Sequence, residues 1–400
     1  MAILDPAALS PPMTPTKRDQ DASAWGNENI NPKTNGQGIA GTLATPPSDE
    51  RTVVGSSRPL DNPEREVSMP ADASPQLSYS TDLQPRNLQG SYIFKRTSSG
   101  RMKQYGQGAW SNVYEADYFP KEPSSNPPQA TSSPRLVAVK TPDKHTLQPA
   151  APILLHEAQI LTYLHLHRPA AAEYIVPFHG VDPSNTSLVL ASLPLTLAAY
   201  SASALYSLHT TTSTMRDPVV GTSTFLHLAT RLISGLAFLH AHAVVHGDIK
   251  PANILLRPSL PPTPLYADFS SATITHASIP ATPAPAITHA YTAPELLAAF
   301  LSSTQSPVAT PASDVYALGA TLLVPATGAE AYAGVDARRR LAMAMDGQVL
   351  PWAACGAQGS RVVKGTLAER VVRRAVGRDS GGRIGMREWG AVVEEEIARV

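Results

Sequence analysis

The sequence predicts an α+β fold in two parts, with a strand-rich part followed by a mainly helical part. Short apolar segments bounded by Gly, Pro, Asn and Ser gather between residues 91 and 192, which is typical of strands. Apolar residues at helical spacing follow over 225–242 and beyond residue 293. Residues 1–88 are rich in Pro, Ser and Thr and poor in aromatic residues, so burial cannot offset their ordering entropy. We expect a disordered arm at 1–88 and one folded domain at 89–400.

The first part is expected to contain a hairpin, further strands and one helix. Gly106 and Gly108 lie between short alternating apolar stretches in residues 105–119, a pattern typical of a hairpin. Residues 151–167 place apolar side chains at helical spacing and carry Glu157, which predicts a helix. Further strands are expected at 135–140, 175–181 and 187–192.

The second part begins with an amphipathic helix at 225–242, in which four leucines repeat at helical spacing. This helix leads into the segment VVHGDIKPANILL at 244–256, which concentrates polar residues between two apolar stretches. A short strand and turn are expected at 265–272, and mostly helices after residue 293. Insertions rich in Pro, Ser and Thr predict surface loops at 119–135, 208–223, 257–264 and 279–289.

Charge and cysteine content exclude several classes of protein. Lys+Arg and Asp+Glu both count 32, so the formal net charge is zero and no nucleic-acid partner is expected. The single cysteine, Cys355, allows no intrachain disulfide, which favours a cytoplasmic or nuclear location, and we expect it to be a small packing residue. No uninterrupted stretch of about 18 apolar residues and no secretory signal pattern occur, so no membrane partner is expected.

Five short motifs stand in the order and approximate spacing of the eukaryotic protein-kinase signature. They are YGQGAWSNVY, VAVK, HGDIKPAN, DFS and APE. A lone glycine pair is a weak signal, whereas five motifs in sequence are specific. Residues 91–400 therefore resemble the eukaryotic-type protein kinase superfamily, serine/threonine type. The resemblance implies a two-lobed protein-kinase-like fold, with a small β-rich N-lobe at about 89–191 and a larger, mainly helical C-lobe at about 192–400.

The resemblance assigns catalytic roles to the polar residues of the HGDIKPAN and DFS motifs. Asp248 would orient the substrate hydroxyl and accept its proton, while Lys250 would neutralise charge on the γ-phosphate. Asn253 and Asp268 would hold Mg²⁺, and ATP would bind between the lobes. The alternative is a loop that carries ordinary turn and capping residues.

Lys140 would contact the α- and β-phosphates and pair with Glu157, because an unpaired ammonium at the end of a buried strand is costly. The alternative is a surface lysine and an unrelated helix glutamate. The third glycine of the family pattern is replaced by Ser111, and a plain hairpin turn explains the glycine pair equally well when it is taken alone. The other nucleotide-binding residues that the resemblance implies are Gly106, Gly108, Val113, Ala138 and Leu255.

Substrate choice and one buried ion pair also follow from the resemblance. Thr288 lies three residues before Tyr291, where serine/threonine kinases place a threonine that contacts the catalytic Asp and Lys. Together with Lys250, it implies protein substrates with Ser or Thr. Glu295 of the APE motif is expected to pair with Arg383, since a lone buried carboxylate is expensive.

Other residues at positions that resemble the family are expected to have structural roles. Asp314 resembles a buried aspartate that anchors the backbone of the catalytic loop. Phe269, His246 and Leu161 resemble the stacked hydrophobic spine of active kinases, and generic core packing is a compatible explanation. The linker between the lobes is placed at 190–193.

Regulation is expected to differ from that of most regulated kinases, which carry Arg before the catalytic Asp. That Arg pairs with a phosphorylated residue of the activation loop. This chain has Gly247 at the position, and glycine offers no side chain to a phosphate. We therefore predict that activity does not depend on phosphorylation of the loop at 271–293, which contains Thr273, Thr275, Ser278 and Thr282.

The N-terminal arm carries one pattern that suggests an upstream partner. Thr14, Pro15, Thr16 and Lys17 match the Ser/Thr-Pro-x-Lys pattern of substrates of cyclin-dependent kinases, so a proline-directed kinase is expected to act on the arm. Chance explains such a short motif equally well in a Pro/Ser/Thr-rich segment.

Two other functions compete with an active serine/threonine kinase. A pseudokinase scaffold would bind nucleotide or partner proteins without efficient phosphoryl transfer, and Ser111 and Ser270, which replace usual glycines, favour it. The retained Lys, Glu, Asp and Asn residues of the motifs oppose it. A small-molecule kinase on a related fold is disfavoured by the APE motif and by the Thr288 segment.

Overall fold

The computed structural model of the chain describes residues 83–121, 133–146, 150–167, 169–208, 215–275, 287–302 and 307–400. Most of the predicted disordered arm, including Thr14, lies outside these residues. So do 122–132, 209–214 and 279–286, which fall within three of the predicted surface loops.

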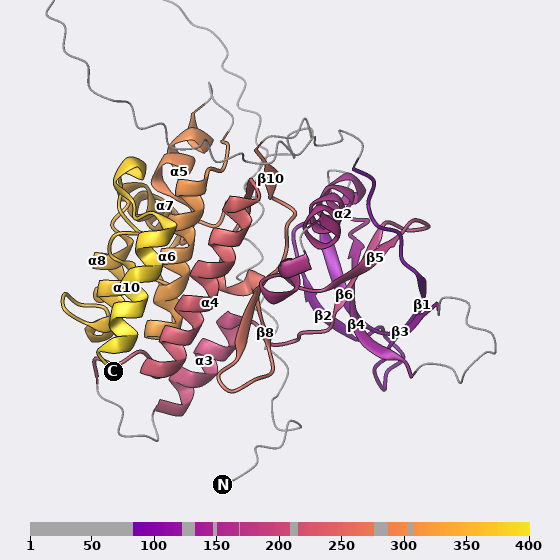
Figure 1. The fold of residues 1–400 in the computed structure, drawn as a ribbon, viewed down its shortest axis with the longest axis horizontal. Coiled ribbons are helices and arrows are strands. Elements are labelled where there is room, and N and C mark those ends of the chain that lie inside the picture. The colour runs from indigo at the N-terminus through magenta and orange to yellow at the C-terminus, as the bar shows by residue number, and fades with distance from the viewer. Residues whose placement is uncertain are drawn as a thin grey trace, which may run out of the picture. The chain divides into compact units, whose positions relative to one another are not determined.

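The first part of the described chain forms a six-stranded sheet with the order β1-β3-β4-β6-β5, and β2 pairs with β3. All neighbouring strands run antiparallel. Helix α2 (Ala150–His167) packs on β4, β5 and β6 (Figure 1). The strands are β1 (Gly90–Phe94), β2 (Gln104–Gln107), β3 (Ser111–Pro120), β4 (Arg135–Pro142), β5 (Phe178–Asp182) and β6 (Ser187–Ala191). The predicted hairpin, strands and helix of this part are therefore confirmed.

Strand register decides which side chains share a face of this sheet. Val113 lies opposite Lys140, and Glu115 lies opposite Ala138. Directly opposed residues of an antiparallel pair point to the same side, and so do residues two apart along one strand. These four side chains therefore share the face of the sheet on which Lys140 lies.

The folded part begins before the predicted boundary at residue 89. Asn87 forms a bridge with Val181, and the Leu88 N–H donates to the Val181 carbonyl at 2.8 Å. Gly180 makes this approach possible, because a Cβ at that position would lie 2.6 Å from the Leu88 nitrogen. Residues 83–88 thus belong to the sheet region, and composition alone did not reveal the pairing.

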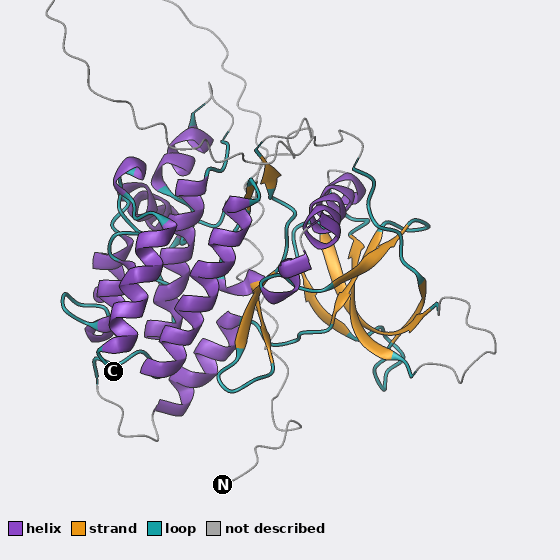
Figure 2. Ribbon diagram, in the orientation of Figure 1, coloured by secondary structure: helices purple, strands orange, loops and turns teal. Residues whose placement is uncertain are grey.

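The second part is mainly helical, as predicted, and Figure 2 shows its helices apart from the strands of the first part. Helices α4 and α10 pack on each other, and α6 packs on α3, α4 and α9. The predicted two-lobed arrangement is confirmed. The helices are α3 (Leu197–Leu208), α4 (Thr222–Ala241), α5 (Pro294–Leu301), α6 (Pro311–Thr327), α7 (Ala337–Asp346), α8 (Val349–Ala354), α9 (Leu367–Val372) and α10 (Met386–Ala398).

Helix α3 is not predicted from the sequence, because Pro194 and several serines interrupt the apolar pattern there. In the structure Pro194 precedes the helix and does not break it. The Ala199 N–H donates to Thr196 Oγ1 at 3.1 Å, which caps the helix start. Leu197 and Ser201 are both fully buried, so tertiary packing outweighs the weak local preference.

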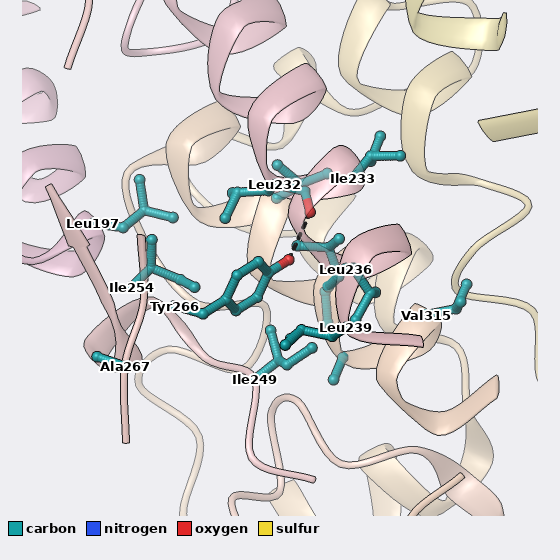
Figure 3. Packing of buried hydrophobic residues seen from close by; sticks show 14 of the residues in the cluster. Leu197, Leu232, Ile233, Leu236, Leu239, Ile249, Ile254, Tyr266, Ala267 and Val315 are labelled. Carbon is teal, nitrogen blue, oxygen red and sulfur yellow. Dashed lines mark hydrogen bonds between the residues drawn. The ribbon is translucent and has the colours of Figure 1, made fainter. Parts of the chain in front are cut away.

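Four leucines of α4 form the buried stripe that the periodicity predicts, and Figure 3 shows three of them around Tyr266. Leu228, Leu232, Leu236 and Leu239 each have 0% exposure. Complete burial of such a side chain contributes about 1.5–3 kcal/mol. The Tyr266 hydroxyl donates to the Leu232 carbonyl at 2.7 Å, so the one polar atom of this ring is satisfied in the core.

Two smaller expectations can be compared with the structure. No helix among the described residues is both long and apolar enough to cross a membrane. Cys355, which follows α8, is exposed, so the expectation that it packs in the interior is wrong.

Candidate active site

A β-hairpin in the C-lobe brings the HGDIKPAN and DFS motifs together. Strand β8 (Ile254–Arg257) pairs with β9 (Thr263–Tyr266), with Ile254 opposite Tyr266. The Ala267 N–H then donates to the Asn253 carbonyl at 2.9 Å. Asn253, just before one strand, and Asp268, just after the other, are therefore neighbours, although fifteen positions separate them in sequence. Part of the predicted loop at 257–264 belongs to this hairpin.

Asp248 is the centre of a compact polar cluster. Its Oδ2 accepts a hydrogen bond from Lys250 Nζ at 2.7 Å and one from Asn253 Nδ2 at 2.9 Å. Burial raises the pKa of the Asp248 carboxyl above its ordinary value, although the nearby Lys250 ammonium opposes the shift. The cluster thus places one carboxylate, one ammonium and one amide around the same point, as the resemblance implies.

Asn253 and Asp268 fit the requirements of a magnesium ion. Both hydrogen bonds that Asn253 makes with Asp248 come from Nδ2, which leaves its Oδ1 as the atom that would face a cation. Burial alone would raise the pKa of Asp268, but the Lys140 ammonium holds it well below its usual range, so the group is a carboxylate. The Asp268 side chain remains 36% exposed.

The donor set decides what kind of metal site this could be. In the described part of the chain, no group of three or more His, Cys, Asp and Glu is placed to hold a metal ion. A cation here would depend on one carboxylate, one amide oxygen, water and phosphate oxygens. Mg²⁺ is typically bound in this way, with a nucleotide supplying the remaining ligands.

Lys140 joins the two lobes through a buried ion-pair network. Its Nζ donates to Glu157 Oε2 at 2.6 Å and to Asp268 Oδ1 at 2.8 Å. Burial alone would lower the pKa of Lys140, but the Asp268 and Glu157 carboxylates outweigh burial and raise it. Burial raises the pKa of Glu157, and Lys140 opposes that rise. The predicted Lys140–Glu157 pair is confirmed, and the alternative of a surface lysine is wrong.

The remaining predicted nucleotide-binding residues lie in two groups. Gly106 and Gly108 are in the β2–β3 hairpin, where the Gly108 N–H donates to the Ser111 carbonyl at 2.7 Å. Val113 and Ala138 share the sheet face of Lys140. Leu255 belongs to the C-lobe, where it bridges with Thr196 at the end of the linker that follows β6. Ala138 lies opposite Leu190 near the end of β6, so Ala138 and Leu255 lie at opposite ends of this linker, which overlaps its predicted position at 190–193.

Asp314 anchors the backbone just before Asp248. Its Oδ2 accepts the His246 N–H at 2.8 Å, and its Oδ1 accepts the Gly247 N–H at 3.0 Å. The His246 and Phe269 rings lie 4.8 Å apart and are fully buried. The predicted anchor is confirmed, and the two rings pack together as expected.

The segment before the APE motif contacts the Asp248 cluster. Lys250 Nζ donates to Thr288 Oγ1 at 3.3 Å, so Thr288 reaches Asp248 through the shared lysine. Arg383 donates to both oxygens of Glu295, at 2.6 and 2.7 Å, and to the Ala312 carbonyl at 2.8 Å. The predicted Glu295–Arg383 pair is confirmed.

Removing this arginine should cost stability. The Arg383 side chain is only 1% exposed, so Arg383→Met would leave Glu295 without its cation. Because the Glu295 side chain itself is 34% exposed, we expect the free energy of unfolding to fall by roughly 1–3 kcal/mol, the cost of losing hydrogen bonds to a charged group. Urea denaturation measures the change. Arg339→Met is the control, because Arg339 is 83% exposed and surface pairs add little; equal effects of both substitutions would contradict the prediction.

Three polar residues near the site, Glu115, Tyr105 and His156, were not predicted from the sequence. Glu115 is buried on the face of Lys140, and Lys103 Nζ lies 2.6 Å from its carboxylate. The Tyr105 hydroxyl lies 2.7 Å from Ser192 Oγ and so connects β2 with the linker. His156 precedes Glu157 on α2 and is also buried. The only available signal was a polar residue within an apolar strand or helix, which does not identify its partner.

The comparisons with known proteins agree with this geometry. A family model described as the protein kinase domain matches residues 101–371. Serine/threonine-protein kinase ISR1 of Eremothecium gossypii is 33% identical over 214 residues, which cover 49% of this chain and 53% of that protein. ISR1 of Saccharomyces cerevisiae is 28% identical over 238 residues, 55% of this chain and 49% of that protein.

A third relative matches a shorter region. Serine/threonine-protein kinase PknK of Mycobacterium tuberculosis is 39% identical over 107 residues, 27% of this chain and 9% of that protein. The chain spans about half the length of the two ISR1 proteins. The family model covers much more, from the glycine hairpin through the Lys140 network and the Asp248 cluster into α9. Because this match includes well over half of the chain, the chain belongs to the protein kinase family.

Proposed function

We propose that this protein is an ATP- and Mg²⁺-dependent serine/threonine protein kinase that transfers the γ-phosphoryl group to protein hydroxyls. The observation that carries the proposal is the pair of hydrogen bonds from Lys140 Nζ to Glu157 and Asp268, 2.6 and 2.8 Å long. They join the N-lobe lysine and the DFS aspartate beside the Asp248 cluster. Family membership and the names of the ISR1 and PknK relatives support the same activity.

The described residues support a division of roles at the site. Asp248 would orient the substrate hydroxyl and take its proton onto a carboxylate oxygen, while Lys250 would neutralise negative charge on the transferred phosphoryl group. Lys140, kept in place by Glu157, would bind the nucleotide phosphates. Bound Mg²⁺ would neutralise charge that develops on the phosphates. Asn253 Oδ1 and the Asp268 carboxylate are the atoms we assign to it.

Phosphate transfer from radiolabelled ATP to a generic protein substrate tests this proposal with the full-length chain. We expect transfer that requires Mg²⁺, is lost in Asp248→Asn, and labels serine and threonine but not tyrosine. A wild type that is as silent as Asp248→Asn but still binds ATP would establish the pseudokinase scaffold instead. Phosphate found on a metabolite and not on protein would support the small-molecule kinase.

We also propose that the kinase does not need phosphorylation of its activation loop. A Cβ built at Gly247 would lie 2.6 Å from the Ser271 carbonyl oxygen, so this position has no space for the usual arginine. A phosphatase-treated sample should keep most of its kcat. Mass spectrometry must show that Thr273, Thr275, Ser278 and Thr282 carry no phosphate in that sample. Loss of most activity from such a sample would contradict the proposal.

Location and upstream control belong to the same proposal. A single cysteine favours the cytoplasm or nucleus, and protein substrates are consistent with either compartment. The upstream proline-directed kinase for Thr14 stays a prediction, because Thr14 lies outside the described residues.

A further inference from the structure

His156 connects the helix that carries Glu157 to the chain that follows Asp268. Its Nε2 lies 2.7 Å from the Ala272 carbonyl oxygen. A carbonyl only accepts hydrogen bonds, so the imidazole must donate from Nε2. His156 is 8% exposed and Ala272 is fully buried, so water cannot readily replace this bond.

The same stretch of chain is held from its other side by the catalytic loop. Gly247 has φ +77°, and its missing Cβ allows the Ser271 carbonyl to lie against the backbone of the loop. Strand β10 (Thr273–Ile274) pairs with β7 (Val244–Val245). Figure 1 shows α2 and β10 at the junction of the helical and strand-rich parts. Residues 271–274 are therefore fixed between α2 and the C-lobe.

Neighbouring positions on α2 then give the helix two separate anchors. Consecutive helical residues point about 100° apart, so His156 and Glu157 face different partners. Glu157 accepts from Lys140 Nζ at 2.6 Å and from the Phe269 N–H at 3.3 Å. A rotation or outward shift of α2 would break the Ala272 contact and the Lys140 contact together.

We propose that His156 is a positioning residue that holds α2 on the segment after Asp268, so that the Lys140–Glu157 pair forms without a phosphate on the activation loop. The inference rests on the proposed kinase function and identifies a contact that keeps the site of that function assembled. The hydrogen bond from His156 to Ala272 takes the place of a phosphate-dependent contact between helix and loop. It is made by two groups that the chain always carries, an imidazole and a backbone carbonyl.

Kinetics of the full-length chain test the proposal through His156→Ala and His156→Gln. We expect His156→Ala to lower kcat by roughly tenfold to a hundredfold, since a buried hydrogen bond that orders the site is lost. The Kd for ADP should change much less. His156→Gln should recover a large part of kcat, because its amide nitrogen can donate to the same carbonyl.

The control is His165→Ala, on the same helix. His165 is partly buried, and its Nδ1 bonds the Leu161 carbonyl of α2 itself, at 2.9 Å. It therefore reports the loss of a partly buried imidazole of α2 whose Nδ1 hydrogen bond stays within the helix. We expect a kcat close to that of the wild type. Equal losses of kcat in His156→Ala and His165→Ala would overturn the proposal, as would a folded His156→Gln with no recovery.

Hydrogen exchange supplies a readout that does not depend on activity. The Phe269 N–H bonds Glu157, and the Thr275 N–H bonds the Ala243 carbonyl at 2.8 Å. Both amides should exchange faster in His156→Ala than in His165→Ala. If the wild type transfers no phosphate but the exchange differs as expected, the kinase proposal fails and the positioning role stands. Unchanged exchange at both amides in His156→Ala would refute the positioning role itself.

Discussion

Asp248→Asn should lower kcat for phosphate transfer by about 10²–10⁴-fold, the range that general-base catalysis contributes. The Asp248 carboxylate accepts hydrogen bonds from both Lys250 and Asn253, at 2.7 and 2.9 Å. An asparagine keeps the size and one oxygen but cannot take the proton of a substrate hydroxyl. The defect should therefore appear in kcat, with little change in the Kd for ADP.

The matched control is Asp336→Asn. Asp336 caps α7 by accepting the Arg339 N–H at 3.1 Å, and asparagine is an equally good capping residue. Its side chain is 59% exposed, so the change removes the same charge at a distant surface position. We expect wild-type kcat for this variant. An Asp248→Asn protein that is as active as Asp336→Asn would remove Asp248 from the mechanism.

Lys140→Met should have a second large effect, on both stability and activity. The substitution leaves Glu157 and Asp268 close together without the cation that now lies between them, and the Glu157 side chain is only 1% exposed. Breaking a buried pair in this way typically costs about 3–5 kcal/mol of folding free energy. Urea denaturation measures this loss, and kcat/KM for ATP should fall because the phosphates lose their lysine.

A double variant separates the loss of folding stability from the loss of phosphate transfer. Lys140→Met combined with Glu157→Gln removes both charges of the pair, so part of the lost stability should return. Activity should not return, because no ammonium is left for the phosphates. Lys144→Met serves as the control, since Lys144 is exposed and lies four residues further along the chain. A Lys140→Met protein with the stability and kcat/KM of Lys144→Met would contradict the assigned role.

The ordered motifs made most of the site predictable. Asp248, Lys250 and Asn253 fall within six positions, so local chain geometry alone keeps them near one another. Lys140 ends a short apolar segment, and Glu157 lies among apolar residues at helical spacing, which predicted a strand and a helix at these positions. The predicted pairs Lys140–Glu157 and Glu295–Arg383 follow from the high cost of burying a single charge.

Other elements could not be predicted because distant chain segments decide them. Helix α3 has a weak local preference, and it is stabilised by the burial of Leu197 and Ser201 as it packs on α6. Strands β7 and β10 have two residues each, too few for any alternation to be visible. The pairing of Asn87 with Val181 depends on a glycine ninety-three positions further along the chain, at Gly180.

The sequence by itself determined the two-part α+β fold, the family resemblance and the residues to which the proposed chemistry is assigned. These features could be predicted because apolar periodicity and charged residues within apolar segments are visible in short stretches of sequence. Only the tertiary structure decided that Gly247 lies against the Ser271 carbonyl and that His156 reaches Ala272. These contacts join residues 24 and 116 positions apart, and a backbone carbonyl has no signature in a sequence. The sequence shows only that position 247 lacks the arginine side chain. The folded protein shows that the backbone of Gly247 lies close to the Ser271 carbonyl, which leaves no space for that side chain.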